Sequence, residues 1–282
     1  MTLPVRDALA RAAGVLHAAG IESARLDARV LLAFALGVSP EFLVTVDEVS
    51  AGRIGEFDRL LARRANREPL AYITGTREFW SLSFTVGPGV LIPRPETETL
   101  IETALKEFPE TAMPLRVLDI GTGSGCLLVA LLAERAPAIG TGVDRSDAAL
   151  GYARRNVSAH GLDRRVHLVR SSWCPPGDGV FDMILSNPPY LSEAEFESAP
   201  PEIRNHEPRT SLVAGPDGLA AMRALGPVLG ALLAPSGLAF FEIGTGQRDA
   251  ATQILQSCGL EVRRAVPDLS GVPRCLVIGR PG

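Results

Sequence analysis

Apolar positions divide the chain into a first part with helical spacing and a second part in which strand and helix patterns alternate. In the first part, apolar residues recur every three or four positions, as they do on one face of a helix. A serine precedes and a glycine follows the second of these segments, as helix caps do. We therefore expect residues 1–75 to form a small all-helical domain. Its predicted helices span 5–19, 23–36 and 54–66, with a short one after Ser39-Pro40.

The helical spacing gives way to strand spacing near residue 79. Between residues 79 and 86, apolar and polar residues alternate, which is the pattern of a half-buried strand. Gly87-Pro88-Gly89 is expected to make a turn, after which 90–92 would return as a second strand. This predicts a β-hairpin linker over 76–93 and a second domain over 94–282.

The second domain alternates strand-like and helix-like segments. Such alternation predicts parallel strands joined by crossover helices, an α/β, doubly wound, Rossmann-like sheet. The predicted strands span 116–120, 138–144, 165–170, 181–187, 237–243 and 274–279.

The first predicted strand of this sheet runs directly into Gly121-Thr122-Gly123-Ser124-Gly125. Glycine allows the backbone to turn tightly and to approach a ligand closely. The spacing is GxGxG rather than the GxGxxG of dinucleotide-binding folds, in which a pyrophosphate meets the helix N-terminus. It favours a ligand without phosphate, such as a nucleoside sulfonium amino acid, and predicts that Gly121, Thr122, Gly123, Ser124 and Gly125 contact this cofactor.

Two residues after the next strands are further candidates for cofactor contact. Asp144 ends the second strand, where a carboxylate can accept hydrogen bonds from both ribose hydroxyls. The alternative is that Asp144 caps the following helix, but Ser146 is better placed for that role. Trp173 follows the third strand, where it would pack against an adenine ring or belong to the core.

The tetrapeptide Asn187-Pro188-Pro189-Tyr190 follows the fourth strand, at the sheet edge where α/β folds place their sites. The Asn187 oxygen and the Pro188 carbonyl can accept the two N–H hydrogens of a planar amide, and Tyr190 offers it a flat face. Both acceptors strengthen as positive charge develops on the nitrogen during methyl transfer. We predict catalytic roles for Asn187, Pro188 and Tyr190, with Pro189 as a further substrate contact. The alternative is a plain proline-rich turn.

Composition excludes some classes of protein. No apolar run reaches the roughly 18 residues of a membrane helix, and no signal peptide is evident, so a cytoplasmic protein without membrane contact is expected. The net charge of −4 shows no bias toward nucleic acid. The histidines and cysteines lack metal-ligand spacing, so no metal is predicted. The cysteines are expected to be small buried residues: Cys126, Cys174, Cys258 and Cys275.

With these motifs in place, the chain resembles the release factor glutamine methyltransferases of the HemK/PrmC type over nearly its whole length. The resemblance rests on the NPPY tetrapeptide, the glycine loop and several further segments. These are PLAYITGTREFWSLSF, VLIPRPETETL, VLDIGTGSG, EPRTSLVAGPDGL, EIGTGQ and DLSGVPRCLVIG.

The resemblance implies a reaction and a set of contacts. Members of this family methylate the side-chain nitrogen (N5) of the glutamine in the GGQ loop of peptide chain release factors. S-adenosyl-L-methionine is the methyl donor and S-adenosyl-L-homocysteine the product. By position, the glycine loop, Asp144, Trp173 and Asn187 would contact the cofactor, and Asn187 to Tyr190 would hold the glutamine. The helical domain would help to hold the release factor. Ser172 departs from the family, which commonly has an acidic residue there.

Three other functions compete with this one. A ribosomal-protein glutamine methyltransferase also uses NPPY, but the segment RPETE at 94–98 is typical of the release factor type. An adenine-N6 nucleic-acid methyltransferase shares the planar-nitrogen chemistry, but would normally present basic surface and would have to flip its base. The third is a protein-binding module that has lost activity, which the intact motifs argue against.

Overall fold

The computed structural model describes residues 2–177 and 179–282, and the chain divides into two compact units. The first unit contains the chain up to Thr76 together with Pro200–His206. The second unit contains Arg77–Ala199 and Glu207–Gly282. In the described residues, no helix combines the length and apolar composition needed to cross a membrane.

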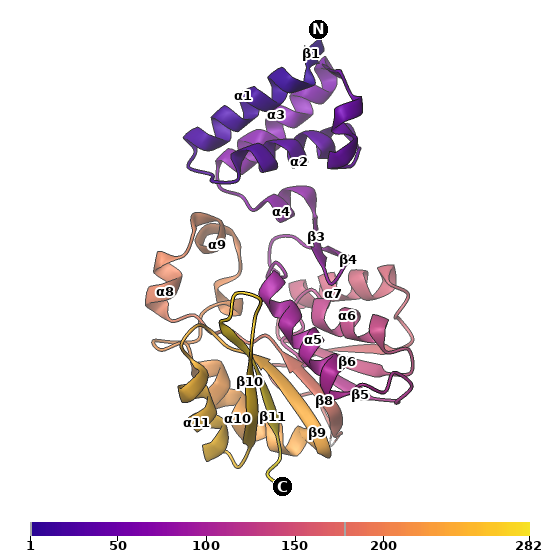
Figure 1. Ribbon diagram of the computed structural model, residues 1–282, viewed down its shortest axis with the longest axis vertical. Helices are drawn as coiled ribbons and strands as arrows, with labels where there is room; N and C mark the ends of the chain where they lie inside the picture. The colour runs from indigo at the N-terminus through magenta and orange to yellow at the C-terminus, as the bar shows by residue number, and fades with distance from the viewer. Residues whose placement is uncertain (1, 178) are drawn as a thin grey trace. The chain divides into compact units, whose positions relative to one another are not determined.

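Three amphipathic helices build the first unit around a core of small and branched side chains (Figure 1). The predicted helices are present, although the segment after Ser39 is a 3₁₀ helix. Two three-residue strands, β1 (Thr2–Pro4) and β2 (Glu48–Ser50), pair antiparallel, which the all-helical prediction did not include. The helices are α1 (Val5–Ala18), α2 (Ala24–Leu36), η1 (Pro40–Thr45), α3 (Ala51–Ala65) and α4 (Leu70–Thr74).

A short helix from much later in the sequence, α9 (Pro201–His206), belongs to this first unit. Its Glu202 accepts from Arg64 at 2.9 Å and from Arg67 at 2.7 Å. Arg64 also donates to the buried carboxylate of Asp27 at 2.7 Å. Every charge in this group therefore has an opposite partner, as buried charges require.

The hairpin lies earlier than the sequence pattern predicted. Strands β3 (Thr76–Phe79) and β4 (Leu82–Thr85) flank a turn at Trp80 and Ser81, both with positive φ. Two such residues match the twist of a hairpin, so the turn forms here rather than at Gly87-Pro88-Gly89. The predicted second strand at 90–92 is therefore wrong. The backbone N–H of Trp80 is held at 2.8 Å by Glu98.

A seven-stranded sheet forms the centre of the second unit, in the order β10-β11-β9-β8-β5-β6-β7. The five strands from β9 to β7 are parallel, as predicted. Strand β11 runs antiparallel to both neighbours, because a short turn at Asp268–Val272 joins it to β10 and leaves no room for a crossover helix. The strands are β5 (Arg116–Ile120), β6 (Ile139–Asp144), β7 (Val166–Arg170), β8 (Phe181–Ser186), β9 (Leu233–Glu242), β10 (Glu261–Pro267) and β11 (Pro273–Gly279).

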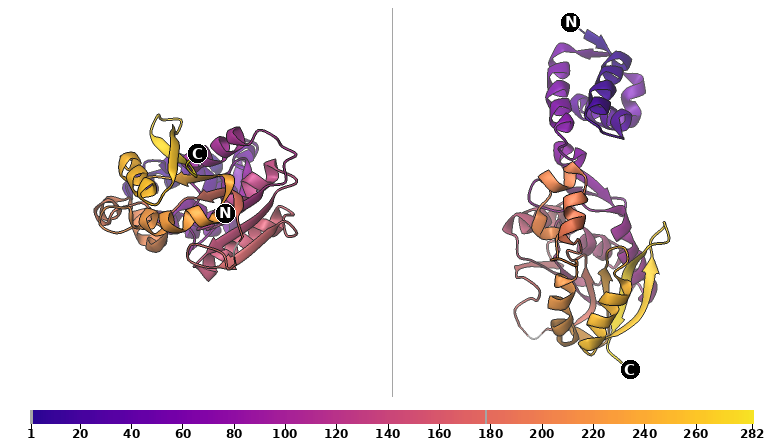
Figure 2. Two further views of the ribbon diagram at one scale, coloured as in Figure 1. Left: turned by 90° about the horizontal axis from the view of Figure 1, so that it is seen from below. Right: turned by 90° about the vertical axis from the view of Figure 1, so that its left-hand side faces the viewer.

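Helices cover both faces of this sheet, so each face has its own apolar cluster (Figure 1). Two further views show the C-terminal strands, in yellow, at one edge of the unit (Figure 2). One face carries α5 (Glu98–Glu107), α6 (Cys126–Glu134) and α7 (Asp147–Ala159), and the other α10 (Ala220–Leu232) and α11 (Arg248–Ser257). The short elements are η2 (Pro95–Thr97), α8 (Glu193–Ser198) and η3 (Arg209–Ser211).

Candidate active site

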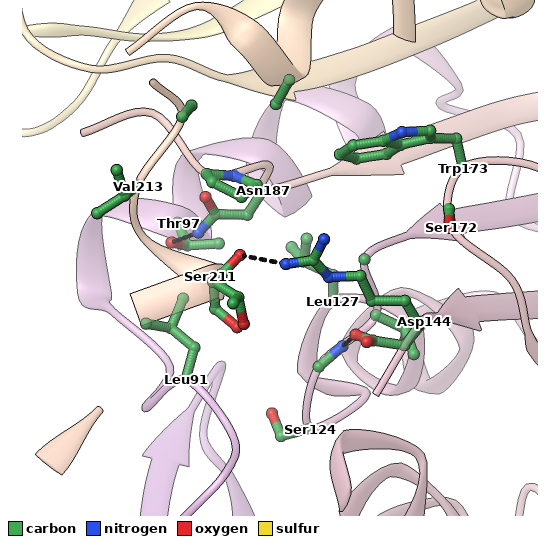
Figure 3. Close-up of a pocket in the computed structure, with 18 of the residues that line it drawn as sticks. Leu91, Thr97, Ser124, Leu127, Asp144, Ser172, Trp173, Asn187, Ser211 and Val213 are labelled. Carbon is green, nitrogen blue, oxygen red and sulfur yellow. Dashed lines mark hydrogen bonds between the residues drawn. The ribbon is translucent and has the colours of Figure 1, made fainter. Parts of the chain in front are cut away.

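A pocket of about 270 Å³ opens at the carboxyl ends of the parallel strands (Figure 3). This is the edge where doubly wound sheets bind ligands, and the volume is close to the small end of the usual range of about 300–1,000 Å³. Of the described residues, the lining does not include Gly125, Pro188 or Tyr190. The predicted site residues that do line it are Gly121, Thr122, Gly123, Ser124, Asp144, Trp173, Asn187 and Pro189.

The glycine loop has the backbone conformation that its sequence requires. Gly121, Gly123 and Gly125 have φ of +73°, +56° and +81°, a region that favours glycine. The N–H groups of Gly121 and Thr122 both donate to the Val143 carbonyl at 2.9 Å, which ties the loop to the end of β6. The loop is therefore a fixed wall of the pocket.

Asp144 stands at the end of β6 and joins two backbone segments. One carboxylate oxygen accepts from the Gly123 N–H at 3.0 Å and the other from the Ser146 N–H at 2.8 Å. Ser146 caps α7 by accepting from the Ala149 N–H at 3.2 Å, which confirms the predicted cap. Because each carboxylate oxygen accepts more than one hydrogen bond, Asp144 keeps acceptor capacity for a ligand hydroxyl.

Two polar side chains at the glycine loop are buried, Asp119 in β5 just before it and Ser124 within it. Burial raises the pKa of Asp119 to about 7; the hydrogen bond from Thr122 opposes this shift, and nearby Asp144 adds to it. The Ser124 hydroxyl is buried at the pocket wall and has no hydrogen-bond partner among the described residues. An unsatisfied hydroxyl at a pocket wall is the feature expected where a polar ligand binds.

Trp173 and Ser172 border the pocket on the side of β7. Trp173 is half-buried, packs against the apolar cluster under α10 and α11, and also lines the pocket (Figure 3). It therefore packs against the core and also borders the pocket, and its contact with an adenine ring stays a prediction. The exposed Ser172 lines the pocket beside it. A flat indole, a glycine loop and a free carboxylate acceptor together suit a nucleoside cofactor.

On the opposite side of the pocket, Asn187 is held by a residue that the sequence did not single out. Its side-chain Nδ2 donates to the Thr97 hydroxyl at 3.0 Å. Thr97 is buried and ends η2, within the RPETE segment. Pro188 is buried and is not part of the pocket lining.

Tyr190 lies beside the buried carboxyl group of Glu242 and is not part of the pocket lining. Burial raises the pKa of its phenol, and the charge of Glu242 adds to the shift. The same residue is fixed by its backbone, since its N–H donates to Leu212 and its carbonyl accepts from Gln247. Burial also raises the pKa of Glu242 to about 7, and hydrogen bonds from Thr97 and Tyr190 lower it in part.

Two arginines at the pocket were also missed by the sequence. Arg94 lines the pocket and forms an ion pair with Glu207, whose other oxygen accepts from the Ile92 N–H at 3.0 Å. The Arg145 guanidinium donates to the Thr210 carbonyl at 3.3 Å. The RPETE segment contains Arg94, and EPRTSL contains the partners Glu207 and Thr210, but neither motif assigns these contacts.

The cysteine prediction was wrong for one residue. Cys174 is exposed, while Cys275 is buried and the other two are half-buried, and all are free thiols. Among the described residues, no group of three or more potential ligands is arranged to hold a metal ion.

Two family models match the chain, one in each part. The model described as "PrmC N-terminal domain" matches residues 7–75, and that described as "Methyltransferase small domain" matches residues 97–201. The second match covers the glycine loop, Asp144 and Asn187. With the doubly wound sheet and its pocket, it makes the chain a methyltransferase.

Curated relatives identify the family within this class. The chain is 42% identical to the release factor glutamine methyltransferase of Caulobacter vibrioides over 96% of its own length and 94% of the relative's. It is 41% identical to that of Geobacter sulfurreducens over 99% and 97%. The chain belongs to the release factor glutamine methyltransferase family.

Solved structures support the fold of the second unit. The catalytic domain of human Mettl16 in complex with an RNA hairpin is similar with a TM-score of 0.57 and 20% identity, over 79% of this chain and 82% of that one. A ribosomal protein L11 methylase from Lactobacillus delbrueckii gives 0.51 and 22%, over 70% and 84%. At these identities the likeness concerns the fold alone.

Proposed function

We propose that this protein transfers a methyl group from S-adenosylmethionine to the side-chain amide nitrogen of the glutamine in the GGQ loop of peptide chain release factors. The observation that carries the proposal is the fixed amide of Asn187 beside the glycine loop, in a chain of this family. A partner that acts in translation places the reaction in the cytoplasm.

The chemical difficulty lies in the acceptor. An amide nitrogen is a weak nucleophile because its lone pair is delocalised into the carbonyl group. The Asn187 oxygen accepts an N–H hydrogen of the acceptor, and this bond strengthens as the nitrogen becomes positive. The Pro188 carbonyl would accept the second hydrogen. After transfer the nitrogen loses one proton to water, so no general base is required.

The residues of the opposite wall fit the cofactor. The backbone of Gly121 to Gly125 allows close approach, and the unpartnered Ser124 hydroxyl and the spare acceptor capacity of Asp144 suit its polar groups. Trp173 would pack against the adenine. S-adenosylmethionine supplies a methyl carbon on a sulfonium sulfur, which keeps the electron pair of the broken C–S bond.

A protein acceptor fits the charge of the chain better than a nucleic acid. The first 75 residues contain nine basic and nine acidic side chains, and the whole chain carries −4. Enzymes that methylate nucleic-acid bases need positive surface for the phosphate backbone. A glutamine in an exposed loop needs no such surface and no base flipping.

The experiment compares three acceptors with labelled S-adenosylmethionine: a native release factor, the same factor with the GGQ glutamine replaced, and DNA in duplex and single-stranded form. We expect label on the native factor alone, with mass spectrometry placing one methyl group on the glutamine. A ribosomal protein substrate serves as a fourth acceptor. Label on DNA, or equal label on both forms of the factor, would contradict the proposal.

A further inference from the structure

Three side chains from distant segments meet behind Asn187. Thr97 ends η2, Tyr190 follows β8, and Glu242 is the last residue of β9. Thr97 and Glu242 are almost completely buried. The Asn187 amide donates to Thr97 at 3.0 Å, and the hydroxyls of Thr97 and Tyr190 both lie beside the Glu242 carboxyl group.

When Glu242 is ionised, the number of hydrogens in this cluster fixes the direction of its hydrogen bonds. A carboxylate only accepts, so the neighbouring hydroxyls of Thr97 and Tyr190 both point their hydrogens to it. A threonine hydroxyl has one hydrogen, and after giving it to Glu242 its oxygen can only accept. The side-chain group of Asn187 that faces Thr97 must therefore be the NH₂ group.

The direction of these bonds determines which end of the Asn187 amide remains for the acceptor. In Figure 3 the amide nitrogen turns toward Thr97 and the amide oxygen turns away from it. A flipped amide would present N–H donors to an acceptor that itself carries N–H hydrogens, and the two would repel. Only the observed orientation can accept a hydrogen from the reacting nitrogen.

We propose that Thr97 and Glu242 are positioning residues that hold the Asn187 side chain with its oxygen toward the acceptor nitrogen. This rests on the proposed methyl transfer to a planar amide. It also gives the RPETE and EIGTGQ segments a shared role, since one supplies Thr97 and the other Glu242.

A purely structural role would not favour a carboxylate at this position. Glu242 is buried, and its Oε2 atom has no hydrogen-bond partner among the described residues. A buried and incompletely bonded carboxylate costs stability, which an apolar residue would avoid. An ionised Glu242 carboxylate, however, only accepts hydrogen bonds, and this forces the Thr97 hydroxyl hydrogen to point away from Asn187.

The test uses the full-length chain and four variants. Thr97→Val removes the hydroxyl at nearly constant shape, and Thr97→Ser restores it. Glu242→Gln introduces a donor, which frees the Thr97 hydrogen to reach the Asn187 oxygen and flip the amide. Thr103→Val is the matched control, because Thr103 is a buried threonine on α5 outside the pocket lining.

We expect Thr97→Val and Glu242→Gln to lower kcat on the release factor about tenfold or more, because misplaced groups lose transition-state contacts. The affinity for S-adenosylhomocysteine, measured by calorimetry, should fall by a smaller factor than kcat, since Asn187 is only one of several predicted cofactor contacts. Thr97→Ser should recover most of kcat, and Thr103→Val should change stability only.

A second readout does not depend on the acceptor. In ¹⁵N-labelled protein, the side-chain amide signal of Asn187, assigned by its loss in Asn187→Ala, should show a hydrogen-bonded proton with slow exchange. That protection should vanish in Thr97→Val and return in Thr97→Ser.

Unchanged kcat and unchanged protection in Thr97→Val would overturn the inference, as would an equal loss of kcat in Thr103→Val or no recovery in Thr97→Ser. If the wild-type protein methylates no release factor, the proposed function fails instead. The protection measurement still decides the orientation of Asn187 in that case.

Discussion

The two sides of the pocket are built from different materials. On the side that we propose binds the cofactor, called the cofactor side below, glycines at alternate positions form the wall, and Asp144 is anchored by the N–H groups of Gly123 and Ser146. On the acceptor side, side chains form the wall. The orientation of Asn187 depends on a hydrogen bond to Thr97, which lies 90 residues earlier in the chain. The first side is local and made of backbone, whereas the second is long-range and made of side chains.

This difference predicts how each side responds to substitution. Backbone hydrogen bonds survive most side-chain changes. Single substitutions on the cofactor side should therefore lower the affinity for the cofactor only moderately. A chain of side-chain hydrogen bonds has no such reserve, because each member fixes the next. Substitutions on the acceptor side should therefore lower the rate of methyl transfer, and by larger factors than substitutions on the cofactor side lower affinity.

The largest effect is expected for Asn187→Ala. It removes the group that we propose accepts from the reacting nitrogen, and loss of one such stabilising group costs about 100-fold or more in rate. Single-turnover methyl transfer to a release factor measures it. Circular dichroism and the thermal midpoint should remain close to those of the wild-type protein.

A near-normal single-turnover rate in Asn187→Ala would contradict the expectation that substitutions on the acceptor side lower the rate of methyl transfer most. The loss should also exceed that of Thr97→Val, because Asn187 touches the acceptor and Thr97 acts only through it. The reverse order would show that Thr97 itself contacts the acceptor.

The sequence predicted the backbone of the glycine loop and the Ser146 cap because their signals are local. The loop needs positive φ at Gly121, Gly123 and Gly125, and the sequence shows this directly because each of these positions is a glycine. The Ser146 cap is also a contact between neighbours, at 3.2 Å to Ala149. The acceptor side was only half predicted: Asn187 was found, but its partners Thr97 and Glu242 are brought to it by the fold alone.

The same distinction explains the errors in the fold. The five parallel strands follow from apolar segments and were predicted. Strand β10 was missed because it is an edge strand with Glu261, Arg263 and Arg264 on it, so its apolar signal is weak. The hairpin turn was misplaced because Trp80 and Ser81 adopt positive φ without glycine, which composition does not reveal.

Stability should depend on pH through one buried acid on each side of the pocket. Asp119 and Glu242 both have a pKa raised to about 7 by burial. An acid whose folded pKa is raised contributes stability that is complete below its unfolded pKa, near 4, and is lost as the pH rises through 7. The free energy of unfolding should therefore fall between pH 5 and 8, by about 2 kcal/mol for each group.

Urea unfolding at pH 5, 6, 7 and 8 measures this slope in the wild-type protein, Glu242→Gln and Asp119→Asn. In each variant, the free energy of unfolding should fall less steeply with pH than in the wild-type protein. An unchanged slope would show that the replaced group does not titrate in this range. The groups that interact with the two acids are Asp144 and Cys126 for Asp119, and Arg274, Tyr190, Glu96, Cys126 and Cys275 for Glu242.

A smaller effect, confined to the cofactor side, is expected for Asp144→Ala. Removing a charged acceptor of ribose hydroxyls should weaken S-adenosylmethionine binding by about 1–3 kcal/mol. The Gly123 and Ser146 N–H groups lose a partner too, but both can reach water. Calorimetry gives the affinity, and kcat at saturating cofactor should change little. Unchanged affinity in a folded variant would remove Asp144 from the cofactor site.

The smallest effect on the pocket is expected from deleting residues 1–75. Both sides of the pocket belong to the second unit, so affinity for S-adenosylhomocysteine should be nearly unchanged. We propose that the deleted domain docks the release factor, so kcat/KM on the intact factor should fall about tenfold or more, while a short glutamine peptide should react as before.

The deletion also leaves Glu202 without its partners Arg64 and Arg67. The full-length variant Glu202→Gln separates this consequence from docking, because it weakens the same ion pairs while the helical domain is kept. If Glu202→Gln loses as much kcat/KM on the factor as the deletion does, the ordering of Pro200–His206 matters and not the docking surface. Equal kcat/KM for the full-length and shortened chains on the intact factor would refute a docking role altogether. Since the peptide does not need a docking surface, a parallel loss on peptide and factor would instead show that the pocket depends on the first unit.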